Sequence, residues 1–191
     1  MPAPRVVIFV DRPDWHTRRL RRAFAVHGVD ALPVALSACG FATEAAGIVI
    51  PGLGGALPDA AFVRTIANGT FEQVTHRLGI LHALSAMGVR VVNDARAIER
   101  CVDKSATSAI LYRHGLPTPP TWSIEDREAA RAIVAREVAA GHEVVAKPLF
   151  GSQGRGLRRL ASPDDLPAGD DVAGLYYLQR LRDEAHRFAI G

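Results

Sequence analysis

The sequence predicts an α/β protein with two regions, a small parallel α/β domain over residues 1–93 and an α+β region over residues 94–191. In the first region, short apolar runs alternate with longer stretches of helical period, which is typical of a parallel sheet with crossover helices. The second region begins near Asn93 with two helical stretches and a proline-rich connector, and a strand, a glycine-rich loop and another strand follow.

The first region is expected to open with a strand over residues 6–10 and a helix over residues 15–27. Asp14 is the candidate N-cap of this helix, and Gly28 lies just past its end. Val6 to Val10 is continuously apolar, as in a strand that is buried on both faces. The remaining elements expected here are strands over 32–36, 47–51 and 89–92 and a helix over 71–87.

The second region is expected to contain helices and short strands. Residues 116–122 lie between them, and the three prolines of this segment favour an extended connector. A helix is expected to start at residues 162–166, where Ser162 precedes Pro163. The other elements expected here are helices over 95–101, 104–114 and 126–140 and strands over 143–147, 157–160, 175–181 and 187–191.

Composition is that of an ordinary soluble globular protein, with 48% hydrophobic and 23% charged residues and a net charge of +3. Four arginines lie within residues 18–22, but they cannot all share one helix face, so we expect a solvated surface and no nucleic-acid partner. Cys39 and Cys101 have neither disulfide-framework nor metal-ligand spacing. No apolar run suits a signal peptide or a membrane span, so we expect a cytoplasmic protein without a membrane partner.

The most informative segment is the glycine-rich loop over residues 151–156, which follows Lys147. Glycines let backbone N–H groups approach phosphate oxygens closely, and a nearby lysine adds a point charge. Because Lys147 ends an apolar run, burying it without an anionic partner would be costly. The loop fits neither the dinucleotide fingerprint nor the Walker loop. A β-hairpin loop without a ligand is the alternative.

No other pattern predicts catalytic chemistry. The seven histidines show no triad or metal-ligand spacing, and there is no nucleophile elbow. The pair Asp103-Lys104 and the turn at residues 52–55 carry little meaning alone. We therefore predict no catalytic side chain and no metal ligand within these residues.

Several segments, taken in order, resemble the RimK-like glutamate ligases of the ATP-grasp superfamily, and the tetrahydromethanopterin-linked ligases are a similar branch. The segments that carry the resemblance are IPGLG (50–54), FEQVTHRLGILHALSAMGVRVVND (71–94), ARAIERCVDKSATSAILYRHGLPTPPTW (95–122), KPLFGSQGRG (147–156), YYLQRL (176–181) and RFAIG (187–191). The resemblance implies a pre-ATP-grasp domain over residues 1–93 and the N-terminal part of an ATP-grasp domain over residues 94–191.

The resemblance also implies a reaction in which ATP phosphorylates a carboxylate and an amine, with glutamate as one candidate, then attacks the acyl phosphate to form an amide. Residues 183–184 would lie near ribose, and the N-terminal domain with the IPGLG turn would face the acid or amine. The implied nucleotide-binding residues are Lys104 and Lys147 at the phosphates, Gly151, Ser152, Gln153, Gly154 and Gly156 in the loop over them, and Gln179, Arg180 and Leu181 beside adenine.

Two departures from the family pattern leave alternatives open. Arg180 stands where the family usually has a glutamate, which puts the adenine contact in question. The ligands for Mg²⁺ are expected beyond residue 191, so we expect a C-terminally truncated chain, with an inactive pseudo-enzyme as the alternative. A non-catalytic ATP-binding module and an α/β scaffold without a nucleotide also stay open, as does a homo-oligomer.

Overall fold

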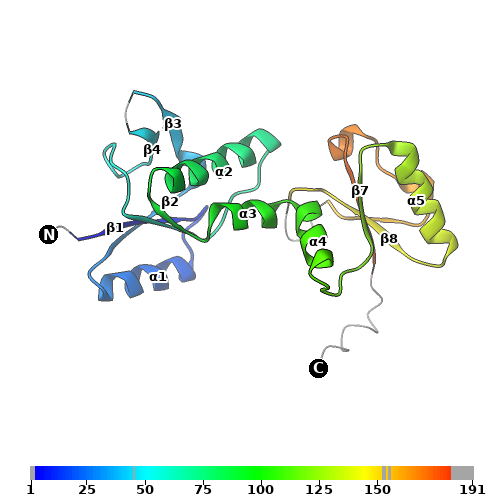
Figure 1. The fold of residues 1–191 in the computed structure, drawn as a ribbon, viewed down its shortest axis with the longest axis horizontal. Helices are drawn as coiled ribbons and strands as arrows, with labels where there is room; N and C mark the ends of the chain where they lie inside the picture. The colour runs from blue at the N-terminus through cyan, green and yellow to red at the C-terminus, as the bar shows by residue number, and fades with distance from the viewer. Residues whose placement is uncertain (1–2, 45, 152–153, 155, 182–191) are drawn as a thin grey trace. The chain divides into compact units, whose positions relative to one another are not determined.

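The computed structural model describes residues 3–44, 46–151, 154 and 156–181, and the chain divides into two compact units, Met1–Glu99 and Arg100–Gly191 (Figure 1). Each unit has its own four-stranded sheet and its own cluster of buried apolar side chains. The fold class predicted from the sequence is confirmed. The functional domain boundary predicted between residues 93 and 94 stays a prediction.

The sheet of the first unit is entirely parallel. Its central strand β1 (Arg5–Phe9) pairs with β2 (Asp30–Val34) on one side and with β5 (Ala60–Val63) on the other. The fourth strand, β6 (Arg90–Val92), pairs with β5. The strand order β2-β1-β5-β6 agrees with the crossover connections that alternating strands and helices predict.

Two helices of the first unit begin at side-chain caps. Helix α1 (Trp15–Val26) starts after Asp14, whose side chain accepts a hydrogen bond from the backbone N–H of Thr17 at 2.8 Å. This confirms the predicted N-cap. Helix α2 (Phe71–Ala86) starts in the same way after Thr70. Such caps satisfy backbone N–H groups that the first helical turn leaves without partners.

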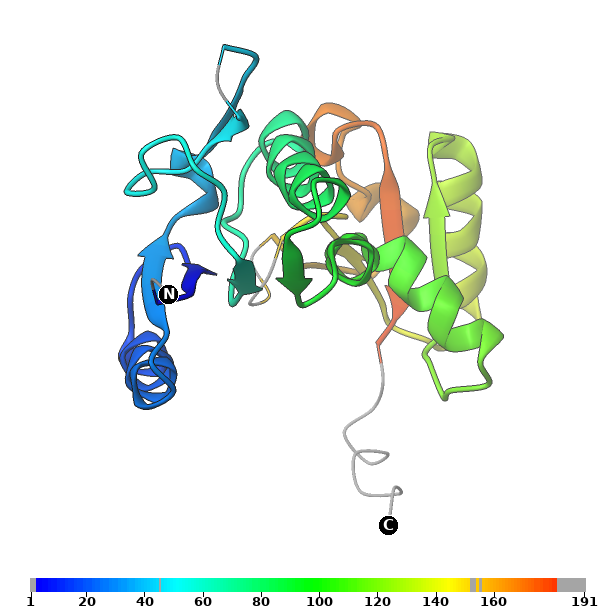
Figure 2. The same ribbon diagram turned by 60° about the vertical axis from the view of Figure 1, so that its left-hand side comes forward.

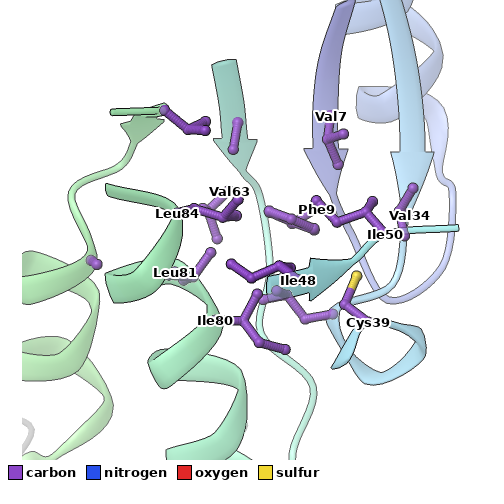
Figure 3. Packing of buried hydrophobic residues seen from close by; sticks show 14 of the residues in the cluster. Val7, Phe9, Val34, Cys39, Ile48, Ile50, Val63, Ile80, Leu81 and Leu84 are labelled. Carbon is purple, nitrogen blue, oxygen red and sulfur yellow. The ribbon is translucent and has the colours of Figure 1, made fainter. Parts of the chain in front are cut away.

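Alternate residues of the parallel strands build the core of the first unit on the face toward α2. Val7 and Phe9 of β1 pack in one buried cluster with Ile80, Leu81 and Leu84 of α2 (Figure 3). On α1, Phe24 makes an edge contact with Phe62 of β5, and their ring centroids lie 6.4 Å apart. Phe62 alternates with Ala61 and Val63 of the same strand, which belong to the cluster with α2. Because successive side chains of a strand point to opposite faces, β5 packs against a helix on each side.

The strand predicted over residues 47–51 exists but does not join the parallel sheet. Strand β4 (Gly47–Val49) pairs antiparallel with β3 (Gly40–Ala42) in a separate two-stranded ribbon. The third parallel strand in chain order is β5, which the sequence prediction missed. Ile48 and Ile50 still belong to the buried core of the first unit, so their apolar character predicted burial correctly. Their predicted place in the parallel sheet was wrong. A one-turn 3₁₀ helix, Leu36–Ala38, precedes the ribbon.

The sheet of the second unit is antiparallel, with the strand order β7-β10-β8-β9. Strand β10 (Tyr176–Arg180) pairs with both β7 (Thr121–Ile124) and β8 (Val144–Lys147), and β8 pairs with β9 (Arg158–Leu160). Strand β7 begins inside the segment predicted as a connector. The proline-rich segment is therefore extended, as expected, but its last two residues belong to an edge strand.

Helix α5 (Arg127–Ala139) packs along one face of this antiparallel sheet (Figure 2). Ala130 and Val134 of α5 are fully buried against Val144 and Leu178. Asp126 caps the helix through the N–H of Ala129 at 2.7 Å. Helix α5 therefore does not cover the opposite face of the sheet.

Helix α3 (Ala95–Val102) and helix α4 (Lys104–Arg113) confirm the two predicted helical stretches. The helix expected from residue 162 is only a 3₁₀ turn, Pro163–Asp165, and a second 3₁₀ turn spans Asp170–Val172. The strand expected over residues 187–191 lies outside the described residues. Within the described part, no helix is long and apolar enough to cross a membrane.

Candidate functional site

Lys104 begins helix α4 and reaches back to the loop that follows β8. The side chain of Asp103 caps the helix by accepting hydrogen bonds from the N–H groups of Ser105 and Ala106. The Nζ of Lys104 donates to the carbonyl oxygens of Leu149 at 2.9 Å and Gly151 at 2.8 Å. Because an ammonium group has three donors, one N–H of Lys104 remains for another acceptor.

Lys147, the last residue of β8, is held by a chain of hydrogen bonds across three strands. Its Nζ donates to Oε1 of Gln179 at 2.5 Å, and Nε2 of Gln179 donates to Oγ1 of Thr121 at 2.9 Å. The hydroxyl of Thr121 donates to the carbonyl oxygen of Pro119 at 2.8 Å. The backbone acceptor at the end fixes the direction of the whole chain, so the amide oxygen of Gln179 faces Lys147. We call this chain the Lys147 relay.

The strand register explains why these side chains meet. Lys147 lies opposite Tyr177, and Gln179 lies opposite Thr121, so all four side chains share the sheet face that α5 does not cover. On this face the hydroxyl of Tyr177 forms a 2.7 Å hydrogen bond with Ser108 of α4. Helix α4 is thereby tied to the same sheet face as the relay.

Both lysines are half-buried, and neither forms an ion pair with a carboxylate in the described part of the chain. Burial, followed by the positive charge of Lys147, lowers the pKa of Lys104, and Asp103 partly opposes this effect. Burial likewise lowers the pKa of Lys147. Two partly desolvated ammonium groups without a protein counter-ion form a site that an anion would stabilise.

The glycine loop follows Lys147 in the chain, and one of its described residues binds the ammonium group of Lys104. Gly151 exposes the carbonyl that Lys104 binds. Gly156 has a φ of 74°, and a Cβ there would lie 2.8 Å from the ring of Pro148. Both conditions favour glycine at this position. Gly154 also has a positive φ. The predicted loop residues Ser152 and Gln153 lie outside the described residues.

The predicted adenine-binding residues lie at the end of β10, where the sheet already uses several of their groups. The N–H of Arg180 donates to Pro120, and the N–H of Leu181 donates to Glu143. The guanidinium of Arg180 is turned to the α5 face, where it binds the carboxylate of Glu137 at 2.6 Å. The side chain of Arg180 therefore has a structural partner, while Gln179 belongs to the Lys147 relay.

Glu137 is a buried carboxylate, with 5% of its side chain exposed, between two guanidinium groups. Arg136 binds Oε1 at 2.8 Å and Arg180 binds Oε2. Burial acts to raise the pKa of Glu137, but the hydrogen bonds from the two arginines outweigh it and hold the pKa below its usual range. Arg136 also lies over the ring of Trp122 at 5.4 Å. This network fastens α5 to β10.

A cavity of about 540 Å³ opens between α4 and the segment that leads into β7. Its lining includes Ser105 and Ser108 of α4 and Thr121 of the Lys147 relay. Cavities of this size are typical of small-molecule sites. The cavity therefore adjoins the hydrogen-bond chain that orients Lys147.

The described residues contain no group of three histidine, cysteine, aspartate or glutamate side chains that could hold a metal ion. Magnesium prefers carboxylate and other oxygen ligands. The described part of the chain does not supply such a set.

Sequence reasoning missed Thr121 and Glu137. Thr121 lay in a segment dominated by prolines, although the following Trp122-Ser123-Ile124 alternation could have indicated a strand. Glu137 has no local signal, because its partner Arg180 is 43 residues further along the chain.

The chain is similar in sequence to ligases of the ATP-grasp superfamily. It is 38% identical over 102 residues to the tetrahydromethanopterin:alpha-L-glutamate ligase of Methanosarcina acetivorans, covering 53% of this chain and 30% of that protein. It is 29% identical over 134 residues to the alpha-aminoadipate–LysW ligase LysX of Saccharolobus solfataricus, covering 63% of this chain and 48% of that protein. The matched part thus spans less than half the length of either relative. No family model matches the chain.

Solved structures show the same fold over nearly the whole chain. A RimK-domain ATP-grasp protein from Sphaerobacter thermophilus has a TM-score of 0.70 and 24% identity, covering 94% of this chain and 64% of that one. D-cycloserine synthetase DcsG has a TM-score of 0.67 and 20% identity, covering 97% and 61%. At these identities the structural likeness establishes the fold. The predicted resemblance to RimK-like ATP-grasp proteins is confirmed.

Proposed function

We propose that this chain, which has the ATP-grasp fold, supplies the nucleotide-binding part of an ATP-dependent carboxylate–amine ligase of the RimK-like type. The observation that carries the proposal is that Lys104 binds the glycine loop and lies close enough to Lys147 for their charges to interact, while neither ammonium group has a carboxylate partner in the described residues. An ATP polyphosphate would provide the missing negative charge. The sequence similarity to named ligases supports amide-bond formation as the reaction class.

In this reaction a substrate carboxylate attacks the γ-phosphoryl group of ATP, which gives an acyl phosphate and ADP. An amine then attacks the acyl carbon and phosphate leaves. The chain contributes positioning and charge neutralisation, which dominate phosphoryl transfer. Lys104 has one free N–H donor and Lys147 has two, and these would bind phosphate oxygens. Backbone N–H groups of the loop around Gly151, Gly154 and Gly156 would bind further oxygens.

We expect fewer contacts with adenine than the sequence suggested. Arg180 would contribute only backbone atoms, because its side chain binds Glu137. The N–H groups of Arg180 and Leu181 are also engaged within the sheet, which leaves carbonyl oxygens and the Leu181 side chain as the contacts available. Gln179 would act mainly by holding Lys147.

We further propose glutamate as the amine substrate and a small molecule, a cofactor or a protein C-terminus as the carboxylate. Support comes from relatives named tetrahydromethanopterin:alpha-L-glutamate ligase in two archaea and beta-citrylglutamate synthase B in Danio rerio. Each match covers about a third or less of the relative, so substrate selection by the whole protein is part of the proposal. Mg²⁺ is the expected companion of ATP, and the cytoplasm is the expected compartment.

The proposal is tested by calorimetric titration with ATP and by a phosphate-release assay with glutamate and a panel of carboxylic acids. The informative variant is Lys147→Met, which removes the charge and keeps the length of the side chain. The matched control is Arg113→Met, since Arg113 is an exposed cation at the far end of α4.

Phosphate release that needs both the acid and the amine, and that is lost in Lys147→Met but not in Arg113→Met, supports a ligase. ATP binding without release in any combination indicates the non-catalytic module instead. Failure of the unaltered chain to bind ATP contradicts both.

A further inference from the structure

Three of the four arginines clustered near the start of α1 line one cavity in the first unit. The cavity has a volume of about 320 Å³ and lies between α1 and the beginning of β2. Arg18, Arg21 and Arg22 contribute to its wall, because positions i, i+3 and i+4 share a helix face. Arg19 points elsewhere and lines a different cavity, together with Trp15 and Phe62. The four arginines therefore lie on two faces of α1, as the sequence suggested, and three of them share one face.

These guanidinium groups lack anionic partners. None of the three lies within ion-pair distance of a carboxylate in the described part of the chain. One acidic residue, Asp30, contributes to the lining. Three basic residues and one acidic residue, all exposed, thus border the cavity, and the basic residues are in excess by two.

Arg21 is fixed in place by the sheet edge. Its Nε donates to the carbonyl oxygen of Ala31 in β2 at 3.2 Å. Strand β2 is an edge strand of the parallel sheet, so Arg21 covers a backbone acceptor there and keeps its terminal N–H groups free. A guanidinium held in this way loses less conformational freedom when it binds an oxyanion.

The remaining lining is apolar and small. Ala25, Val29 and Ala31 contribute to it, and Ala31 is buried. The volume lies at the lower end of the range for small-molecule sites, about 300–1,000 Å³. A compact ligand therefore fits better than a nucleic-acid strand, which needs an extended basic track.

We propose that this cavity of Arg18, Arg21 and Arg22 binds a compact anion with at least two negative groups of carboxylate or phosphate type. The planar fork of arginine pairs with either group through two parallel hydrogen bonds. The inference is independent of the proposed ligase activity, because it concerns the first unit alone.

The test is calorimetric titration at low ionic strength with citrate in one arm and inorganic pyrophosphate in the other. All titrations use a Lys104→Met/Lys147→Met background, so that the proposed nucleotide site does not contribute to pyrophosphate binding. The result therefore does not depend on whether that site binds ATP.

The informative variant is Arg18→Gln/Arg22→Gln, since both side chains are exposed and make no hydrogen bond within the described residues. Arg21 is left unchanged because it holds the sheet edge. The control is Arg12→Gln/Arg19→Gln, which changes the net charge equally away from this cavity.

We expect at least one probe to bind the background protein, with a weakening of about tenfold or more in Arg18→Gln/Arg22→Gln and less than about twofold in the control. Binding of citrate alone assigns carboxylate chemistry, and binding of pyrophosphate alone assigns phosphate chemistry. The proposal is overturned if neither probe binds at concentrations up to about 10 mM. It is equally overturned if both double variants weaken binding to the same degree.

Discussion

Thr121→Val tests whether the Lys147 relay orients the phosphate-binding lysine. The substitution keeps the branched shape of the side chain and removes the hydroxyl that joins Gln179 to the backbone of Pro119. Two hydrogen bonds are lost, at 2.9 Å and 2.8 Å. A buried or half-buried hydrogen bond contributes about 0.5–1.5 kcal/mol net, so we expect the free energy of unfolding to fall by about 1–2 kcal/mol.

The larger consequence concerns the amide of Gln179. Without Thr121 as an acceptor, the N–H₂ end of the Gln179 amide loses its partner, and only the hydrogen bond to Lys147 still holds the amide in place. A loss of about 1.4 kcal/mol in the preorganisation of Lys147 would weaken ATP binding about tenfold.

The assay is calorimetric titration with ATP, paired with urea unfolding of the same samples. Ser123→Ala is the matched control, because Ser123 lies two residues further along β7 on the same face with an exposed side chain. We expect this control to bind ATP as the unaltered chain does. If Thr121→Val binds ATP with unchanged affinity while Lys147→Met does not bind, the relay has no positioning role.

Three further predictions concern stability and reactivity. Replacing Glu137 by Gln should lower the free energy of unfolding by about 2 kcal/mol, because the buried partner of Arg180 loses its charge. The folded pKa of Glu137 is depressed below its ordinary value of 4.5, so its contribution to stability is present above that pH and is lost as the pH falls through the folded pKa. Urea unfolding between neutral and acidic pH should show this loss only in the unaltered chain. Burial raises the pKa of Cys39 to about 11, whereas Cys101 is exposed, so iodoacetamide at mildly alkaline pH should label Cys101 first, and mass spectrometry that finds Cys39 modified equally fast would contradict the burial. Asp14→Ala should remove the capping box of α1 and lower the free energy of unfolding by about 1 kcal/mol, and a thermal melt that matches the unaltered chain would show that the cap contributes nothing.

The features that the sequence predicted well have local causes. Asp14 and Asp126 indicate where helices begin, and Gly28 indicates where a helix ends, because capping depends on neighbouring backbone groups. The position of Lys147 shortly before the glycine loop is likewise a feature of the local sequence. These signals need no knowledge of the distant chain.

The features that the sequence did not predict depend on distant partners. Strand β5 has only four residues, Ala60–Val63, and becomes a strand by pairing with β1, more than fifty residues earlier. The apolar residues of β4 resemble those of a parallel strand, although β4 pairs only with β3 in the separate ribbon. The contact between Arg180 and Glu137 was not predicted for a related reason, since it forms only when α5 packs on the sheet.

The central claim is that Lys104 and Lys147 form one phosphate-binding site, and ATP titration of Lys104→Met, Lys147→Met and the double variant tests it most directly. Hydrogen bonds to charged groups contribute about 1.5–3 kcal/mol each, so the double variant should bind ATP about 100-fold more weakly or worse than the unaltered chain. Arg113→Met serves as the charge-matched control for the single variants. An unaltered chain and a double variant with equal affinity for ATP would contradict the claim.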